Sequence, residues 1–313
     1  MPSPAVPEDR FIAYVRAYGV RGTARKLGVA ERDVYRRRRR IEARLGITID
    51  SPNVILQERT ASPTARRHIE VQNGVVLVGS DAHYWPGIVS TAHAGFVHFC
   101  KKLKPQVVVL NGDLVDGAKL SRHPPIGWEY SPDFADELDA VGDRLKEIEK
   151  AAPKAMRYWP AGNHDLRYES KIAKEMPELA RVKGVHLKDH FPNWLPCWSL
   201  WINDNTVIKH RWKGGKHAAH NNAKDSGMHF VTGHLHQGTV SRHTNYRGSF
   251  WGVSLPTMAE PLGPQFMYGE DNPSDSASGF AVLTYIDGQL LMPELALVSD
   301  VGVIEFRGER FQL

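Results

Sequence analysis

Five short groups of histidine, aspartate and asparagine residues lie in order along this chain. They are Ser80-Asp81-Ala82-His83, Gly112-Asp113-Leu114-Val115-Asp116, Gly162-Asn163-His164-Asp165, a lone His210, and Gly233-His234-Leu235-His236. Carboxylate and amide oxygens, together with neutral imidazoles, are donors that divalent metal ions take in proteins. Two such ions bridged by one carboxylate can activate a water molecule and neutralise the charge of a phosphate group. The five groups therefore predict a site for two metal ions.

The candidate ligands share a place in the expected fold. Three of the groups follow apolar or strand-like runs, over residues 75–78, 107–110 and 156–159. Loops at the ends of strands are where α/β folds place their chemistry. Cys100 and Cys197 stand far apart and in no metal-binding spacing, so we expect both to be structural. The predicted ligands are Asp81, His83, Asp113, Asn163, His210, His234 and His236.

The order of these groups resembles the calcineurin-like metallophosphoesterase superfamily, whose pattern runs D-x-H, G-D-x-x-D, G-N-H-D/E, H and G-H-x-H. The resemblance covers roughly residues 70 to 240. It implies an α/β fold, a four-layer α-β-β-α sandwich with two packed sheets. It also implies three ligand roles: Asp81, His83 and His236 hold one metal, Asn163, His210 and His234 hold the other, and Asp113 bridges them.

The same resemblance implies hydrolysis of phosphate esters. A hydroxide that bridges the two metals attacks phosphorus while the leaving oxygen departs in line. His164 protonates the leaving alkoxide, and Asp116 accepts the ring N–H of His164 and orients the imidazole. Asp165 is a further candidate for supporting the ligands. Mn²⁺ is the expected metal, although Fe, Zn, Ni or Mg could occupy such a mixed oxygen and imidazole site.

Departures from subfamily patterns narrow the substrate class. The phosphoprotein phosphatases of this superfamily carry Arg-Gly where this chain has Gly117-Ala118, and they favour Glu where it has Asp165, so a Ser/Thr protein phosphatase is disfavoured. The Gly-Asn-His-Asp form is shared with nucleases of the double-strand-break-repair type and with many phage-encoded and cyclic-nucleotide phosphoesterases. Candidate contacts to substrate phosphate are Arg122, His123 and Arg167.

The first 46 residues predict a small helical module. Helices are expected over residues 11–18, 23–27 and 31–45, separated by glycines. Residues 23–36 resemble a helix-turn-helix, whose last helix would enter a major groove of DNA. Residues 1–70 hold 15 Lys or Arg and 8 Asp or Glu, a net charge of +7, while the remainder sums to −2. The predicted DNA contacts, to phosphates more than to bases, are Arg32, Arg36, Arg37 and Arg40.

The composition fits two folded parts. The 313 residues with 42% hydrophobic content suit one catalytic domain and a small appendage, predicted as residues 1–46, a linker over 47–65 and a catalytic domain over 66–313. No apolar run of 18 residues occurs, and no charged segment followed by an apolar stretch opens the chain, so neither a membrane span nor a signal peptide is expected. The cysteine usage predicts a cytoplasmic setting, and the resemblance suggests a bacterial, phage or prophage origin.

Several local patterns predict further elements. Asn73-Gly74 predicts a hairpin between residues 68–72 and 75–79. Strands are expected over residues 249–255, 280–285, 289–291 and 301–306, with a turn at Asp287-Gly288. Residues 133–150 predict an amphipathic helix whose charges are solvated.

Other residues offer alternatives to the main interpretation. His217, His220 or His229 could replace His210 as a ligand, although His210 ends an apolar run as the family pattern requires. Lys213-Gly214-Gly215-Lys216 could contact phosphate, but it lacks the Ser/Thr and spacing of a P-loop. Three tryptophans, Trp194, Trp198 and Trp201, could stack on unpaired bases or simply pack in the interior.

These observations favour a two-metal phosphodiesterase acting on DNA, a nuclease guided by its amino-terminal module. One alternative is a phosphomonoesterase or small-molecule phosphodiesterase that the module tethers to DNA. Another is a DNA-binding regulator with a decayed catalytic domain, which the full ligand set argues against. The expected partner is DNA and not a membrane; a homodimer is compatible with a helix-turn-helix, and an ATPase partner stays open.

Overall fold

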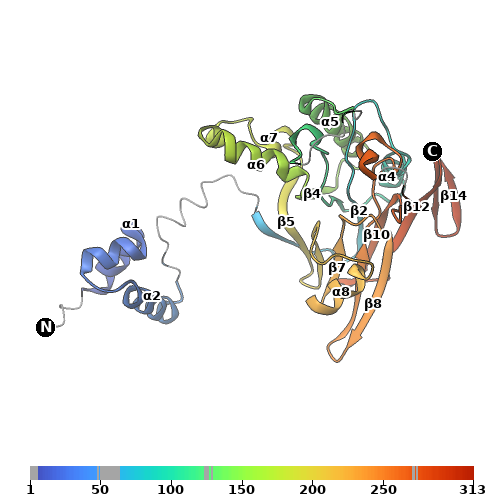
Figure 1. Ribbon diagram of the computed structural model, residues 1–313. Coiled ribbons are helices and arrows are strands. Elements are labelled where there is room, and N and C mark those ends of the chain that lie inside the picture. The colour runs from blue at the N-terminus through green and yellow to red at the C-terminus, as the bar shows by residue number, and fades with distance from the viewer. Residues whose placement is uncertain are drawn as a thin grey trace. The chain divides into compact units, whose positions relative to one another are not determined.

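The computed structural model describes residues 6–47, 49, 64–122, 127, 130–269, 272 and 274–313. The chain divides into two compact units, Met1–Ser62 and Pro63–Leu313, each of which is built on its own elements (Figure 1). Most of the segment predicted as a linker, namely residues 48 and 50–63, lies outside the described residues. The predicted α/β fold with an amino-terminal helical region is confirmed.

The amino-terminal unit consists of two described helices around a small apolar core. Helix α1 spans Glu8–Leu27, but Gly19 has non-helical backbone angles (φ 65°, ψ −178°), so α1 is two helical segments joined at a kink. The break between helices that the sequence predicts before residue 28 is therefore present, at Gly19. Gly28, with φ of 64°, ends α1 in the left-handed conformation that glycine adopts without strain. Helix α2 spans Glu31–Leu45. The core side chains are Phe11, Val15, Ala24, Val34, Ile41 and Ile49.

The second unit is built on one continuous sheet. Its strand order is β14 (Glu309–Gln312), β13 (Val303–Phe306), β12 (Glu294–Asp300), β10 (Gly279–Ile286), β2 (Gly74–Gly79), β3 (Val107–Leu110), β4 (Met156–Pro160), β5 (Leu195–Ile202), β6 (Thr206–Ile208), β7 (His229–Thr232), β9 (Gly248–Ser254) and β8 (Thr239–Asn245). Strand β1 (Thr64–Ile69) pairs with β5, and β11 (Gln289–Leu290) pairs with β10. Strands β2 to β5 run parallel to one another, so their carboxyl ends share one edge.

Two apolar cores show how the layers pack. The first joins helices α4 (Thr91–Leu103) and α5 (Phe134–Ala151) to one face of the sheet, through side chains such as Phe96, Phe99 and Ile148. The second joins both halves of the sheet, with Val78 and Val109 in the same cluster as Val253. The sheet therefore folds back on itself as two packed layers. The remaining described helical segments are α6 (Asp165–Glu175), α7 (Leu187–His190), α8 (Ala218–Ser226), η1 (Ala118–Leu120), η2 (Pro177–Arg181) and η3 (Pro264–Gly269).

The predicted hairpin across Asn73-Gly74 is wrong. Strand β2 lies between β3 and β10, and β1 pairs with β5 instead of with β2. The residues of this turn contact another turn: the Asn73 side chain accepts a hydrogen bond from the Asp287 N–H at 3.0 Å, and the Gln72 carbonyl accepts one from Gly288 at 2.9 Å. Burial of β2 in the sheet centre outweighed the local turn signal.

Most of the other predicted elements are confirmed. The strands after the last ligand correspond to β9, β10, β11 and β13, and Asp287 and Gly288 form the β10–β11 turn with φ of 48° and 75°. Helix α5 buries Val141, Leu145 and Ile148, as its pattern predicts. The expectation that all its charges are solvated is wrong, because Glu137 is fully buried. None of the described helices is long and apolar enough to cross a membrane.

Candidate metal centre

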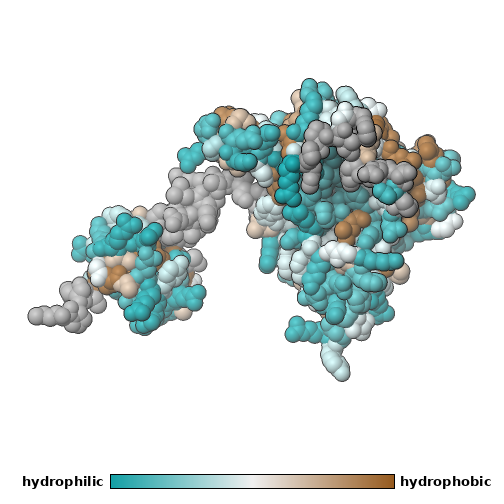
Figure 2. Space-filling model, viewed as in Figure 1, coloured by the Kyte–Doolittle hydropathy of each residue, from teal (hydrophilic) through white to brown (hydrophobic). Residues whose placement is uncertain are grey.

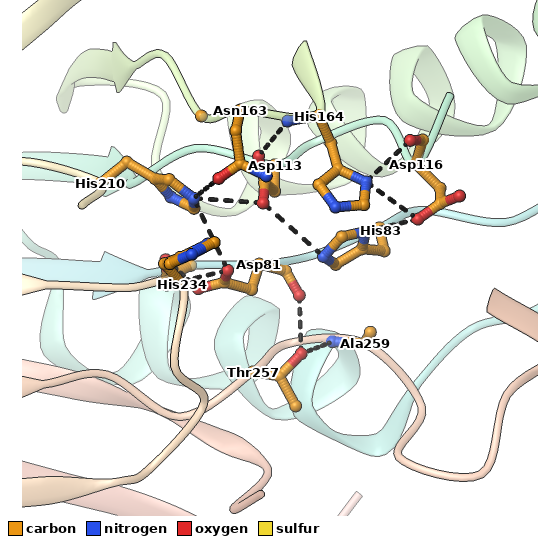
Figure 3. A network of polar contacts seen from close by, with 12 residues as sticks. Asp81, His83, Asp113, Asp116, Asn163, His164, His210, His234, Thr257 and Ala259 are labelled. Atoms are coloured by element: carbon orange, nitrogen blue, oxygen red, sulfur yellow. Dashed lines mark hydrogen bonds and ion pairs between the residues drawn. The ribbon is translucent and has the colours of Figure 1, made fainter. Parts of the chain in front are cut away.

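The candidate ligands lie in loops that follow strands of the sheet (Figure 3). The first pair, Asp81 and His83, follows β2, and Asp113 follows β3. The other ligands follow β4, β6 and β7; they are Asn163, His210, His234 and His236. Because β2, β3 and β4 are parallel neighbours, their loops meet at the same edge of the sheet. Strands β6 and β7 run antiparallel to β5, so strand direction alone does not bring their loops to this edge. A hydrogen bond from the His234 N–H to the Asp81 carboxylate at 2.9 Å shows that the loop after β7 reaches the same site.

Three groups of donor atoms form in these loops: two match the predicted ligands, and the third consists of His83, Asp116 and His164. In the first group, Asp81, His83 and His236 each offer a ligand atom within 4.8 Å of the others. In the second group, Asp113, His210 and His234 do the same. The amide oxygen of Asn163 lies 3.2 Å from His210 Nε2 and so adjoins the second group. Carboxylate, amide and imidazole donors in two adjacent groups fit a pair of divalent ions.

Two carboxylates connect the groups. Asp113 Oδ2 lies 3.1 Å from His210 Nε2 and 3.9 Å from His83 Nε2, so it faces donors of both groups. Asp81 Oδ1 lies 3.2 Å from His236 Nε2 and 3.9 Å from His210 Nε2. Both side chains are fully buried or nearly so. Each carboxylate therefore faces donors of both groups at similar distances, so either has the position to bridge two ions.

The carboxylates and imidazoles of the site shift the pKa values of one another. Burial alone would raise the pKa of Asp81, but the nearby imidazoles of His236 and His210 hold that pKa well below its ordinary value. Burial alone would lower the pKa of His210, but the carboxylates of Asp113 and Asp81 raise it to about 10. The carboxylates thus stay ionised at neutral pH. Since metals bind neutral imidazole, an ion that binds His210 releases the proton held there.

The backbone of the ligand loops is strained. Non-glycine residues rarely adopt positive φ, at a cost of about 1–3 kcal/mol each, and such residues cluster at functional sites. Five of the candidate ligands do so: Asp81 (53°), His83 (38°), Asp113 (53°), His234 (68°) and His236 (56°). Backbone hydrogen bonds between the loops hold this geometry, from the Asp81 N–H to the Gly112 carbonyl and from the His83 N–H to the Asp113 carbonyl.

Two glycines of the ligand groups are required by close approach. A Cβ at position 162 would lie 2.0 Å from Asp113 Oδ1, and a Cβ at position 233 would lie 1.9 Å from Ser80 Oγ. Real side chains do not tolerate such distances, so each loop reaches its neighbour only through glycine. The glycines of the motifs therefore set the spacing between ligands and do not take part in the chemistry.

Asp165 links the two loops that carry Asp113 and Asn163. Its buried carboxylate accepts hydrogen bonds from Asp113 N–H at 3.0 Å, Leu114 N–H at 2.8 Å, Gly162 N–H at 2.8 Å and the Trp159 indole at 2.9 Å. One side chain thus ties the loop after β3 to the loop after β4. Burial, followed by the charge of Asp113, raises the pKa of Asp165 above its ordinary value.

His164 and Asp116 lie beside the first donor group. The Nδ1 atom of His164 lies 2.8 Å from the Asp116 carbonyl oxygen and 3.2 Å from the Asp116 carboxylate, while His83 Nδ1 lies 2.9 Å from the same carboxylate. Asp116 therefore orients two imidazoles at once. Burial alone would lower the pKa of His164, but Asp116 and Asp113 raise it above its ordinary value.

The predicted phosphate contacts differ in their surroundings. Arg167 donates to the Asp116 carbonyl at 2.9 Å and lies 3.2 Å from His164 Nε2, so it borders the site. Arg122 is exposed, and no ion pair is found for it among the described residues. His123 lies outside the described residues.

Three supporting residues escaped the sequence interpretation. Glu137 on α5 accepts hydrogen bonds from the N–H groups of Gly117 at 2.6 Å and Ala118 at 3.3 Å, which directly follow Asp116. Burial, with the charge of Asp116 adding to it, raises the pKa of Glu137 to about 7. The Thr257 hydroxyl donates to the Asp81 carbonyl at 2.7 Å. The Phe266 ring lies edge-on or tilted against both His83 and His236. None of the three belongs to a recognisable motif.

The alternative histidines lie elsewhere. His217 is exposed at the start of α8, His220 contacts Ser241 on β8, and His229 accepts a hydrogen bond from the Trp251 N–H. The three tryptophans differ in their surroundings: Trp194 is buried, Trp198 is 37% exposed, and Trp201 stacks on His68 with ring centroids 5.6 Å apart.

The predicted DNA contacts lie on α2. Arg32, Arg36 and Arg40 are exposed there, on a unit whose visible surface is mainly hydrophilic (Figure 2). Arg37 differs, because its guanidinium lies 4.4 Å from the centroid of the Phe11 ring and donates to the Val6 carbonyl. Arg37 therefore packs within its own unit.

Comparison with known proteins adds a family assignment. A family model described as calcineurin-like phosphoesterase matches residues 75–247, which include every candidate ligand. Comparison with curated proteins gave no match. Among solved structures, the chain is similar to a novel archaeal phosphodiesterase (14% identity, 72% of this chain and 99% of that chain covered, TM-score 0.37). It is also similar to a dimetal phosphatase from Danio rerio, with 12% identity, coverage of 80% of this chain and 98% of that chain, and a TM-score of 0.38. A third similar structure is Vps29 complexed with Zn²⁺ from Entamoeba histolytica, with 16% identity, coverage of 76% of this chain and 98% of that chain, and a TM-score of 0.40.

Proposed function

The chain belongs to the calcineurin-like phosphoesterase family, and from this premise we propose that it is a metal-dependent phosphodiesterase that cleaves DNA. The observation that carries the hydrolytic part is the pair of adjacent donor groups linked by Asp113, with His164 beside them. When bound, two divalent ions would supply an activated water molecule and neutralise the phosphate oxygens. The metal proposed is Mn²⁺, with Fe, Zn, Ni and Mg as alternatives.

The residues around the donor groups have separate tasks in this proposal. Asp116 orients His164 through its carbonyl and carboxylate oxygens. The His164 side chain is 18% exposed, so its ring can reach a substrate and donate a proton to the leaving oxygen. Arg167 donates to the Asp116 carbonyl and lies next to His164, and in this proposal it contacts a phosphate oxygen of the substrate.

The DNA part of the proposal rests on the exposed arginines of α2. The outward face of this helix carries Arg32, Arg36, Arg39 and Arg40, with Tyr35 among them. No ion pair within 4.0 Å is found for Arg36, Arg39 or Arg40 in the described part of the chain, so their charges are free to meet phosphates. Contacts of this kind give affinity with little sequence preference and fall steeply with salt.

The test is hydrolysis by the purified protein in Mn²⁺ on end-labelled single- and double-stranded DNA and on chromogenic mono- and diesters. The Asp113→Asn protein serves as the blank. DNA cleavage that is absent from the blank is the expected result. Cleavage of the small esters alone would overturn the nuclease and favour a small-molecule phosphoesterase that its basic module tethers to DNA.

A further inference from the structure

The loop of residues 211–217 borders the candidate metal centre. It starts immediately after His210, and its Gly215 carbonyl accepts a hydrogen bond of 3.3 Å from the side chain of Gln237, the residue after His236. The loop is thus joined in sequence to one candidate ligand, His210, and hydrogen-bonded to the neighbour of another, His236. Adjacent residues of an extended chain advance by at most about 3.6 Å, so the Cα of Trp212 lies within about 7 Å of the Cα of His210.

The loop presents an aromatic ring to solvent. Trp212 is 45% exposed, and its ring packs on Phe230 of β7 with centroids 5.0 Å apart and planes tilted by 33°. Phe230 is buried, so it supports the indole from the protein side. A large aromatic ring held at the surface in this way offers a platform on which a flat ligand can stack.

Contacts to α8 hold the loop in place. The Lys213 N–H donates to the Asn222 side chain at 3.2 Å, and the Lys213 ammonium forms an ion pair with Asp225. The same ammonium lies 5.4 Å from the centroid of the Trp212 ring. The platform is therefore anchored before any ligand binds, which lowers the entropy cost of binding.

The loop of Trp212 also carries two exposed cations without an ion-pair partner among the described residues. Arg211 and Lys216 are exposed, and within the described residues neither has an acidic side chain within 4.0 Å. A cation next to an exposed aromatic ring is the combination that binds single-stranded nucleic acid: the ring stacks on a base and the cation meets the backbone.

We propose that residues 211–217 form a nucleotide subsite, in which Trp212 stacks on a base next to the scissile phosphate while Arg211 and Lys216 contact backbone phosphates. The ligand is an unpaired nucleotide of the substrate strand. This inference rests on the proposed function, since it requires a nucleic acid at the metal centre.

The experiment compares two substrates in Mn²⁺: a single-stranded oligonucleotide and methyl 4-nitrophenyl phosphate, a chromogenic diester without a base. Trp212→Leu keeps an apolar contact to Phe230 but removes the stacking ring, and it should raise KM for the oligonucleotide on the order of 10-fold. The kcat/KM for the small diester should stay within about twofold. Trp212→Phe should restore most of the affinity. Tyr246→Leu, at the exposed tip of the β8–β9 hairpin, is the matched control and should change neither substrate.

An abasic oligonucleotide of the same length makes the test decisive. The wild-type protein should have a higher KM for the abasic than for the normal oligonucleotide, whereas the KM of Trp212→Leu should differ little between the two. The reason is that loss of the base and loss of the indole remove the same stacking interaction. Equal losses on both ester substrates would assign Trp212 a purely structural role and overturn the subsite. Wild-type protein that cleaves the diester but no oligonucleotide would instead refute the proposed function, whereas oligonucleotide cleavage unaffected by Trp212→Leu would refute the subsite alone.

Discussion

The metal centre and the outward face of α2 use charge in opposite ways. In the metal centre the charged side chains are buried and have several partners; Asp116 contacts His83, His164 and Arg167. On α2, Arg36 and Arg40 are exposed and have no ion-pair partner among the described residues. At the metal centre the exact position of each charged side chain therefore decides the effect of a substitution, because removing one group leaves others buried and unpaired. On α2 only the sum of charges matters, and each arginine contributes a little.

The largest expected effect follows from changing Asp113, one of the two carboxylates that face both donor groups. Asp113→Asn removes the charge that His83 and His210 share, so turnover should fall to the background of the assay on every substrate. Metal content measured by mass spectrometry should fall in parallel. Substantial activity in this variant would show that position is less decisive here than the contacts indicate, and it would transfer the bridging task to Asp81.

His164→Ala separates proton transfer from metal binding. Because His164 lies beside the donor groups and contacts Asp116, its removal should lower kcat on the order of 10²- to 10⁴-fold. The metal content should remain that of the wild type. Loss of metal from this variant would contradict the assigned role and make His164 a ligand. A leaving group of low pKa, such as 4-nitrophenolate, should reduce the defect, since it needs no proton.

Glu137→Gln tests how Glu137, which holds the N–H groups after Asp116, changes the stability of the protein with pH. The pKa of Glu137 is about 7 in the folded protein against 4.5 ordinarily, so the folded state holds the proton more tightly. Stability from this group is present below about pH 4.5 and is lost as pH rises through 7. As the pH rises from 4.5 to above 7, the wild type should lose about 3 kcal/mol of unfolding free energy that Glu137→Gln does not lose.

Denaturant titrations of both proteins from pH 4.5 to pH 8 measure this difference. Asp143→Asn, a change at an exposed acid on the same helix, is the control and should show no such trend. A constant difference between Glu137→Gln and wild type across this range would mean that Glu137 is ionised throughout and acts only as a hydrogen-bond acceptor.

Part of the fold and of the metal centre was predictable from the sequence because it depends on residues that are close together in the chain. Short apolar runs marked β2 and β3, and the turn chemistry of Asp287-Gly288 marked the β10–β11 connection. The family pattern likewise needs only the order of short motifs, and the family is confirmed by the match over residues 75–247. The α/β fold followed from the same patterns.

The rest depends on interactions that no local pattern records. Asn73-Gly74 has the composition of a hairpin turn, but strand pairing was decided by where β2 could be buried on both sides. Glu137 occupies a polar position of an amphipathic helix, and only the tertiary fold shows that it faces the N–H groups after Asp116. Thr257 contacts Asp81 across 176 positions of sequence, a separation at which periodicity carries no information.

The smallest expected effect comes from the arginines of α2. Replacing Arg36 and Arg40 together by alanine should weaken DNA binding roughly 10-fold and reduce the slope of log affinity against log salt by about 2, one for each phosphate that is no longer neutralised. Hydrolysis of a small diester should not change, because both arginines belong to the amino-terminal unit and the metal centre belongs to the other. Arg310→Ala, at an exposed arginine of β14, is the control and should leave the slope unaltered. A decrease in DNA affinity that does not depend on salt would contradict phosphate binding and point to a specific, position-dependent role on α2, like that of the metal centre.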